Sequence, residues 1–385
     1  MIVHFIKENL PQRMYRLLFF AILLFYIRVA LEYAALLIKR YAGYTIEDAI
    51  NKHGIAIIIS IYSLFFTFYL NIPVILFNFL GLFLYNPFDR RVERNENFDR
   101  VPFICFRVVT RGLYLKLVTD ITEKNIETCK NVGLKNFRFE IVSDSALNLP
   151  LSNFVREVIV PNDYNTPNGT LFKARALHYC LDKNVNILSR DDWIVHLDEE
   201  TLLSETVLNG ISNFVSNPNS NIGQGIISYA ECGVENWLTT LMEGQREAAD
   251  YGLYRLAFQF LHRPVFGFHG SFMVIKAGIE EKIGFDFGPK ECIAEDLRFA
   301  LAAWHRGYRF DFVKGVMKEN GTFSITDFVK QRRRWFVGHF QIIWETSIPL
   351  YCKWALMPMH VDNRSPDQAL GCLGLGGGLR KVESA

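Results

Sequence analysis

The chain has 385 residues, of which half are hydrophobic and 33 are Phe, and its formal net charge is +2. A chain of this length exceeds one average domain, and its near-neutral charge gives no reason to expect nucleic-acid binding. The seven cysteines form no CxxC pair and no zinc-finger spacing, which favours a reduced compartment over a disulfide framework.

Two long apolar runs lie near the N-terminus. Residues 17–37 and 55–84 are each long enough to cross a bilayer. The second run contains Pro73, so it is either one kinked spanning helix or a helix that ends near Tyr69 and continues along the interface. We therefore predict a membrane region over 1–100 with two transmembrane helices.

The basic residues around these runs carry a weak topological signal. Lys and Arg are slightly more abundant outside the pair of runs than between them. This distribution favours a cytoplasmic location for both outer segments. We therefore expect the rest of the chain to face the cytosol.

Strands and helices alternate after the turn-rich boundary at 86–100, over a predicted soluble domain at 101–340. Strands are predicted at 103–110, 137–142, 155–160 and from 193, and helices at 122–131, 173–181 and 202–215. This alternation indicates an α/β fold with a parallel, doubly wound sheet.

Three carboxylates follow the apolar strand that begins at Trp193, namely Asp198, Glu199 and Glu200. In open α/β sheets, ligands bind beyond the carboxyl ends of the strands. The triplet is therefore a candidate site for a divalent metal that holds a phosphorylated substrate. It is equally well interpreted as a solvated acidic turn before the next helix.

Two further candidates lie upstream of the triplet. Asp144 ends a predicted strand, where it would hold a nucleotide or simply form an Asx turn. Lys173 sits on the first turn of a helix with Arg175, so it would either reach a diphosphate or belong to a solvated basic pair.

Three more candidates lie downstream. The loop 267–273 has glycines that permit close approach of a ligand or a tight turn. Glu295 and Asp296 open a helix, where carboxylates often only stabilise the helix dipole. The segment 331–335 (QRRRW) would bind phosphate or anchor the chain at a membrane surface.

The order of these segments is more specific than any one of them. It resembles the family-2 glycosyltransferases over roughly 103–335, and most closely the egghead-type β-1,4-mannosyltransferases of invertebrates. The segments that carry the resemblance are WIVHLDEET at 193–201, TLFKARAL at 170–177, GFHGSFM at 267–273, EDLRFA at 295–300 and QRRRW at 331–335. The resemblance implies a GT-A-type, mostly parallel, Rossmann-like sheet and inversion at the anomeric carbon.

The resemblance also implies a role for each matching residue. Asp296 would be the general base, supported by Glu295, and Asp198 with Glu200 would bind Mn²⁺ or Mg²⁺, although Glu199 is an alternative ligand. The implied residues that bind the nucleotide sugar are Asp144, Lys173, Asp198 and Arg334, and those that bind the acceptor and close the site are His269, Gly270, Gln331 and Trp335.

The implied reaction is transfer of mannose from GDP-mannose to a glucosylceramide-type lipid, in glycosphingolipid biosynthesis. The enzyme would be an integral membrane protein of the ER or Golgi whose catalytic domain faces the cytosol.

Two alternatives depend on the C-terminal segment 341–385. Its apolar stretches are short for membrane spans and its end is rich in Gly and Leu, so we expect a short interfacial segment and a disordered tail. The alternatives are a processive polysaccharide synthase that uses a UDP-sugar and a non-catalytic membrane-bound form.

Overall fold

The computed structural model describes residues 45–356, apart from 87–90, 96, 150–151, 230, 232–233, 235, 289–290, 346 and 354–355, together with a few positions between 28 and 39. Side chains at 64–70 and 291–292 are not described. The first predicted membrane span, 17–37, lies largely outside these residues, and the tail from 357 lies wholly outside them.

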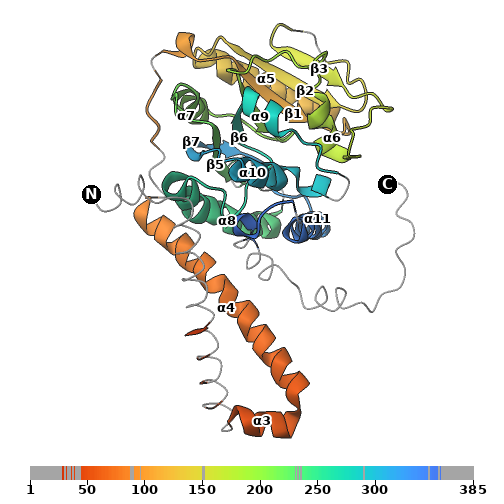
Figure 1. Ribbon diagram of the computed structural model, residues 1–385. Coiled ribbons are helices and arrows are strands. Elements are labelled where there is room, and N and C mark those ends of the chain that lie inside the picture. The colour runs from red at the N-terminus through yellow and green to blue at the C-terminus, as the bar shows by residue number, and fades with distance from the viewer. Residues whose placement is uncertain are drawn as a thin grey trace. The chain divides into compact units, whose positions relative to one another are not determined.

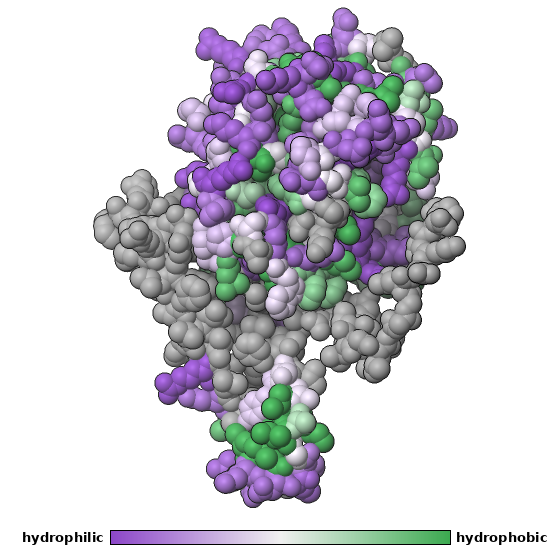
Figure 2. All heavy atoms as spheres, turned by 45° about the vertical axis from the view of Figure 1, so that its right-hand side comes forward, coloured by the Kyte–Doolittle hydropathy of each residue, from purple (hydrophilic) through white to green (hydrophobic). Residues whose placement is uncertain are grey.

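The N-terminal part of the described chain contains two helices. Thr45 and Asp48 form a capping box that begins α3 (Ile46–His53), and Gly54 at φ 81° separates it from α4 (Ile55–Leu84). The second apolar run is therefore one continuous helix, and the alternative that it ends near Tyr69 is wrong. Figure 2 shows apolar side chains gathered on its first turns, where several isoleucines are exposed.

None of the helices among the described residues combines the length and hydropathy needed to cross a membrane. By its contacts the chain divides into two compact units, and the helices and strands from Ile75 to Leu356 belong to one of them. The other unit contains α3 and the first part of α4.

A seven-stranded sheet organises the larger unit, in the order β3-β2-β1-β4-β6-β5-β7 (Figure 1). Its strands are β1 (Ile104–Val109), β2 (Phe137–Ser143), β3 (Val155–Ile159), β4 (Trp193–Leu197), β5 (Ile222–Ser228), β6 (Met273–Lys276) and β7 (Phe310–Lys318). β6 runs antiparallel to both of its neighbours, and the other pairings are parallel. The prediction of an α/β, mostly parallel sheet is confirmed, but a wholly parallel sheet is wrong because of β6.

Helices connect the strands and cover the sheet. They are α5 (Leu115–Asn131), α6 (Phe172–Tyr179), α7 (Glu205–Val215), α8 (Trp237–Ala249), α9 (Ala277–Ile283), α10 (Glu295–His305), α11 (Ile325–Trp344) and α12 (Leu350–Lys353). α7 begins three residues later than predicted. Leu202 instead pairs its backbone with Lys318, and the Ser204 hydroxyl accepts a hydrogen bond from the Val207 N–H as the helix cap.

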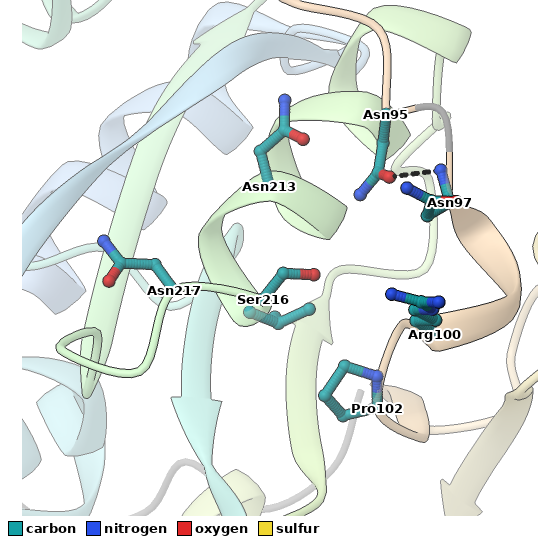
Figure 3. A pocket seen from close by; sticks show the side chains of 8 residues that line it. Asn95, Asn97, Arg100, Pro102, Asn213, Ser216 and Asn217 are labelled. Carbon is teal, nitrogen blue, oxygen red and sulfur yellow. Dashed lines mark hydrogen bonds between the residues drawn. The ribbon is translucent and has the colours of Figure 1, made fainter.

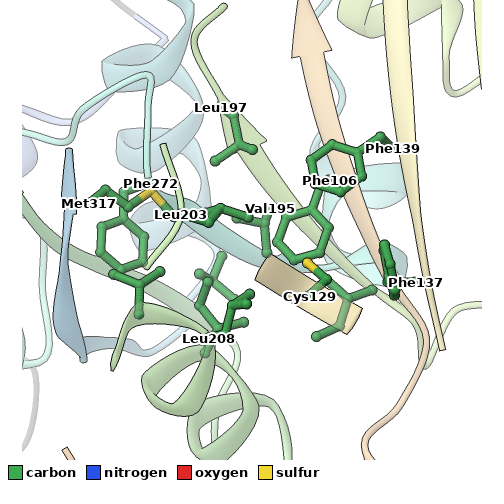
Figure 4. Packing of buried hydrophobic residues seen from close by; sticks show 14 of the residues in the cluster. Phe106, Cys129, Phe137, Phe139, Val195, Leu197, Leu203, Leu208, Phe272 and Met317 are labelled. Carbon is green, nitrogen blue, oxygen red and sulfur yellow. The ribbon is translucent and has the colours of Figure 1, made fainter. Parts of the chain in front are cut away.

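The main hydrophobic core lies between the sheet and helices α5 and α7. Phe106 on β1 stacks on Phe139 on β2 with ring centroids 4.8 Å apart, and Figure 4 shows Leu208 of α7 and Cys129 of α5 in the same cluster. Burial of each large apolar side chain contributes about 1.5–3 kcal/mol. This core holds the strands rigid, so their ends have defined positions.

The opposite face of the sheet carries a buried row of charged side chains. Cross-strand register places Arg107 of β1 beside Glu140 of β2 and His196 of β4. Arg107 donates to Glu140 at 2.7 Å and to Glu280 of α9 at 2.5 Å, and Arg156 of β3 donates to Glu140 at 2.6 Å. Buried charges are tolerated only when they are paired in this way.

Glu280 also contacts the ring of His196, whose Nε2 lies 2.6 Å from a Glu280 oxygen. Burial alone would raise the pKa of Glu280, but His196 and Arg107 outweigh it and the pKa is lowered. Glu280 is therefore ionised at neutral pH, and its contacts with Arg107 and His196 hold α9 against the sheet.

The last turns of α4 pack against a π-helical segment, Asp250–Tyr254. A Cβ added at Gly81 would lie 2.1 Å from the carbonyl oxygen of Gly252, so only glycine permits this approach. The Asn78 side chain accepts the Leu253 N–H at 3.0 Å. The π-helical segment presents Asp250, whose carboxylate accepts the Ile227 N–H of β5 at 3.2 Å.

We predict that Glu280→Ala destabilises the fold by about 3 kcal/mol, because it leaves Arg107 and His196 buried with fewer partners. The matched control is the neighbouring Glu281→Ala, since Glu281 pairs with Arg190 at the surface and should cost less than about 1 kcal/mol. Urea unfolding at pH 7 measures both losses. Because the pKa of Glu280 is lowered, its contribution is fully present above about pH 4.5 and is lost as the pH falls through the folded pKa. An equal loss of stability in the two variants would show that the buried charged row does not stabilise the fold.

Candidate active site

The candidate site lies at the carboxyl edge of the sheet. Asp144 follows β2, Asp198 follows β4 and Glu319 follows β7. The strands they follow all run in one direction, so these ends share an edge. The loop that contains Gly270 and Ser271 leads into the antiparallel β6 and therefore reaches the same edge.

Lys173, on the first turn of α6, contacts both the acidic turn after β4 and the loop before β6. Its Nζ lies 2.9 Å from Asp198 Oδ1 and 3.4 Å from the carbonyl oxygen of Gly270. Burial opposes its charged form, but Asp198, Glu295 and Asp296 outweigh burial and raise the pKa of Lys173. Its ammonium group is therefore charged at the centre of the carboxylates.

Gly270 leaves space between these groups. A Cβ built on it would lie 3.1 Å from Asp296 Oδ2 and 3.6 Å from Lys173 Nζ. The glycine therefore brings its backbone close to both charged side chains, and the predicted close approach of a ligand stays a prediction.

The acidic triplet divides into different environments. Burial would raise the pKa of Asp198, but Lys173, Arg246 and Arg334 together lower it. Burial, with repulsion from Asp198 and Glu319, raises the pKa of Glu200 to about 8. Glu200 therefore keeps its proton near neutral pH, because the surrounding carboxylates and its burial oppose its ionisation.

Glu199 is engaged elsewhere. Its Oε2 accepts a hydrogen bond from the hydroxyl of Thr110, just after β1, at 2.5 Å. Glu200 shares the electrostatic environment of Asp198. The Thr110 contact occupies one oxygen of Glu199, and the choice between Glu199 and Glu200 as the second metal ligand stays a prediction.

The carboxylates suit a hard divalent cation. Oxygen ligands are those that Mg²⁺ and Mn²⁺ prefer, and a cation would relieve the repulsion that raises the pKa of Glu200. Within the described part of the chain, no three Asp, Glu, His or Cys side chains form a group able to hold a metal ion.

Glu295 and Asp296 lie at the start of α10, on the other side of Lys173. Burial and the neighbouring Asp296 raise the pKa of Glu295 to about 7, and burial also raises the pKa of Asp296. Asp296 Oδ1 accepts the Leu297 N–H at 2.7 Å. A carboxylate whose pKa is raised toward neutrality is suited to general base catalysis.

The helix α11 contributes an aromatic and cationic wall. The Trp335 ring has the Arg332 guanidinium 4.3 Å from its centroid and that of Arg246, from α8, at 4.7 Å. Arg332 is also paired with the buried Glu243 at 2.6 Å. Arg334 is exposed and lowers the pKa of Asp198.

The other predicted residues lie at the margin. Asp144 pairs with Arg175 of α6 at 2.6 Å and is 58% exposed. The His269 ring packs against Tyr254 with centroids 4.6 Å apart, and its Nδ1 is 3.5 Å from Asp250. The Gln331 side-chain oxygen is buried and has no hydrogen-bond partner among the described residues. The roles predicted for these residues stay predictions.

Glu319 and Arg246 are site residues that the sequence reasoning missed. Glu319 is 3% exposed and follows β7 directly. The rule that singled out Asp198, a carboxylate after a buried strand, would have found Glu319 had β7 been recognised. Arg246 lies in the last turn of α8 and has no comparable sequence signal.

A surface pocket lies elsewhere, lined by asparagines and by Arg100, Pro102, Val215 and Ser216 (Figure 3). Pro102 precedes β1, and Asn217 follows α7 and precedes β5. The pocket is therefore near the amino ends of these parallel strands, opposite to the carboxylates, and is not part of the candidate site.

Comparisons with known proteins identify the family of the chain. A profile of the family described as "Glycosyl transferase family group 2" matches residues 193–365. The chain is 42% identical over 330 residues to "Beta-1,4-mannosyltransferase egh" of Drosophila melanogaster, covering 83% of this chain and 72% of that protein. It is also 42% identical to "Beta-1,4-mannosyltransferase bre-3" of Caenorhabditis elegans, covering 81% and 71%.

Among solved structures, a mannosyltransferase from Pyrobaculum calidifontis in complex with GDP-Man and Mn²⁺ is similar with a TM-score of 0.45 and 15% identity. The similarity covers 79% of this chain and 90% of that one.

We predict that Glu200→Gln stabilises the chain at pH 8 and hardly at pH 5. The pKa of Glu200 is raised from 4.5 to about 8 in the folded protein. The free energy of unfolding of the protein is therefore not reduced by Glu200 below about pH 4.5, and it falls as the pH rises from there to about 8. The melting temperature in EDTA should rise by about 3 °C at pH 8. Glu199→Gln is the matched control and should give no such rise, since Glu199 accepts a hydrogen bond from Thr110. A rise in melting temperature of the same size at pH 5 would show that the raised pKa of Glu200 is not the cause.

Proposed function

The chain belongs to the family-2 glycosyltransferases, among the egghead-type β-1,4-mannosyltransferases, and we propose that it transfers mannose from GDP-mannose to a glucosylceramide-type lipid with inversion. It is thus a hexosyltransferase. The observation that carries the proposal is the arrangement of Asp198, Lys173, Gly270 and Asp296 at one edge of the sheet. In this arrangement the ammonium group of Lys173, which would bind phosphate, lies beside Asp296, the proposed general base.

In the proposed reaction, the acceptor hydroxyl oxygen attacks the anomeric carbon of mannose. The glycosidic bond forms as the bond from that carbon to the diphosphate oxygen breaks, and GDP leaves with the electron pair. Asp296 takes the hydroxyl proton, supported by Glu295. The buried environment that raises the pKa of Asp296 makes it a stronger base than an exposed aspartate.

Lys173 stabilises the leaving diphosphate. Its ammonium group lies within a few ångströms of the donor-side carboxylate of Asp198, and the exposed Arg334 adds a second cation nearby. A Mn²⁺ or Mg²⁺ ion bound by Asp198 and Glu200 would supply further charge neutralisation.

The remaining site residues hold the two substrates. Asp144 contacts the nucleoside, and its position next to Arg175 at the end of β2 supports this role. On the acceptor side, His269 and Gly270 line the loop before β6. Gln331 has a buried oxygen available for an acceptor hydroxyl or amide, and Trp335 closes the site together with the guanidinium groups over its ring. The fold proposed for this arrangement is GT-A.

We also propose that the enzyme resides in the ER or Golgi membrane with its catalytic domain in the cytosol. The exposed isoleucines on the first turns of α4 support membrane contact, as do exposed apolar side chains on the helices α8 and α11. A lipid acceptor would meet the site from the surface of α8 and α11.

Membranes that contain the protein should transfer labelled mannose from GDP-mannose to glucosylceramide. Asp296→Asn should lower the rate about 10²–10⁴-fold, the range for loss of a general base. Asp311→Asn is the matched control, because Asp311 lies at the amino end of β7 and pairs with Arg309 and His262. Polymer formation from UDP-sugars instead would overturn the proposal, and transfer that survives Asp296→Asn would overturn the assigned base.

The orientation has a separate test. The sequons at Asn168, Asn320 and Asn363 should carry no glycan if the domain is cytosolic. The mobility of the protein should therefore not change on endoglycosidase treatment, and Asn168→Gln should migrate like the wild type. A mobility shift that disappears in Asn168→Gln would place the domain in the lumen.

A further inference from the structure

Glu319 makes a set of contacts that none of the predicted roles uses. It is 3% exposed, directly after β7. Its Oε1 accepts the hydroxyl of Thr201 at 2.7 Å and the hydroxyl of Ser271 at 2.5 Å. Burial and the nearby Asp198 raise its pKa, and these two hydrogen bonds oppose the rise.

The two hydroxyls in turn face the backbone of Asp198. The Asp198 N–H lies 3.1 Å from Thr201 Oγ1 and 3.4 Å from Ser271 Oγ. Each hydroxyl has one hydrogen and two lone pairs. Since both hydrogens point to Glu319, the lone pairs are left to receive the Asp198 N–H. These hydrogen bonds, from the Asp198 N–H to the two hydroxyls and from the hydroxyls to Glu319, form a relay. Because Glu319 accepts from both hydroxyls, it decides which atom donates and which accepts in each bond of the relay.

The relay joins three separate segments of the site. Thr201 ends the acidic turn, Ser271 belongs to the loop before β6, and Glu319 extends β7. Gln224 of β5 holds the same loop by hydrogen bonds to the backbone of His269 and Ser271. Gln224 thus ties the loop to the sheet, whereas Glu319 ties it to the acidic turn.

We propose that Glu319 is a positioning residue for the nucleotide sugar. Through Thr201 and Ser271 it fixes the turn at Asp198, so that the Asp198 carboxylate meets Lys173 while the loop presents Gly270 to Asp296. This inference rests on the proposed function, because it assigns the Asp198 side of the site to the donor. Glu319 itself acts as a hydrogen-bond acceptor and touches no substrate.

The test compares two substitutions in the full-length protein in detergent. Glu319→Ala removes the acceptor, and Glu319→Gln keeps a side-chain oxygen but removes the charge. Titration with GDP-mannose gives the dissociation constant and the number of binding sites, and steady-state assays give the KM for glucosylceramide. Glu319→Ala should weaken donor binding about tenfold or more, and Glu319→Gln should stay within about threefold of the wild type. The KM for the acceptor should not change.

Thr201→Val provides an independent arm, because valine has the shape of threonine without the hydroxyl. It should weaken donor binding in the same direction as Glu319→Ala, and the double variant should be no worse than Glu319→Ala alone, since both break one relay. The control is Asp311→Ala, which removes a carboxylate with hydrogen-bond partners from the far end of the same strand. Its donor affinity should match that of the wild type.

The outcomes separate the inference from the proposed function. Loss of binding sites at unchanged affinity in Glu319→Ala would show a merely structural role and overturn the inference, as would wild-type affinity in this variant. Equal weakening by Ala and Gln would assign the effect to charge and overturn it too. If the wild type binds UDP-sugars but not GDP-mannose, the proposed donor is wrong, and the same titrations with the bound sugar decide the role of Glu319. If it binds no nucleotide sugar, both proposals fall.

Discussion

The row of charged side chains, in which Glu140, Arg107 and His196 are buried and Arg156 is partly exposed, constrains the relative register of four neighbouring strands. A slip of one residue would turn these charges into the phenylalanine core and the phenylalanines toward α9. The cost of unpaired buried charge makes such a slip prohibitive. The carboxyl ends of β1, β2 and β4 are therefore aligned, and Asp198 stands two residues beyond the row that sets its place.

The site above this row concentrates negative charge around few cations. Lys173 and Arg246 lower the electrostatic cost of Asp198, while Glu200 and Glu319 keep raised pKa values. Such repulsion destabilises the free protein and is relieved by a cation or a cationic group. The same arrangement supplies a base at Asp296. Repulsion among the carboxylates thus lowers the stability of the fold, but it favours substrate binding and proton transfer.

The strands with continuous apolar runs were predictable from sequence. β1, β2, β3 and β4 lie close to their predicted limits, and the helix predicted over 122–131 ends at Asn131 as predicted but begins earlier, at Leu115. β5 (IGQGIIS) and β7 (FDFVKGVMK) were not predicted, because glycines and charged residues interrupt their apolar pattern. Their pairing comes from neighbours distant in sequence, which periodicity does not report.

The sequence by itself determined the local chemistry, because strand-end carboxylates, a lysine on a first helical turn and the order of the motifs are properties of short segments. It therefore identified Asp198, Lys173 and Asp296 and the family to which the chain belongs. Only the tertiary structure decided that Glu199 accepts a hydrogen bond from Thr110 and that burial, with repulsion from Asp198 and Glu319, raises the pKa of Glu200. It also decided that segments far apart in the chain meet through a carboxylate after β7. Such contacts depend on strand order and side-chain direction, and those are set by the packing of the whole sheet.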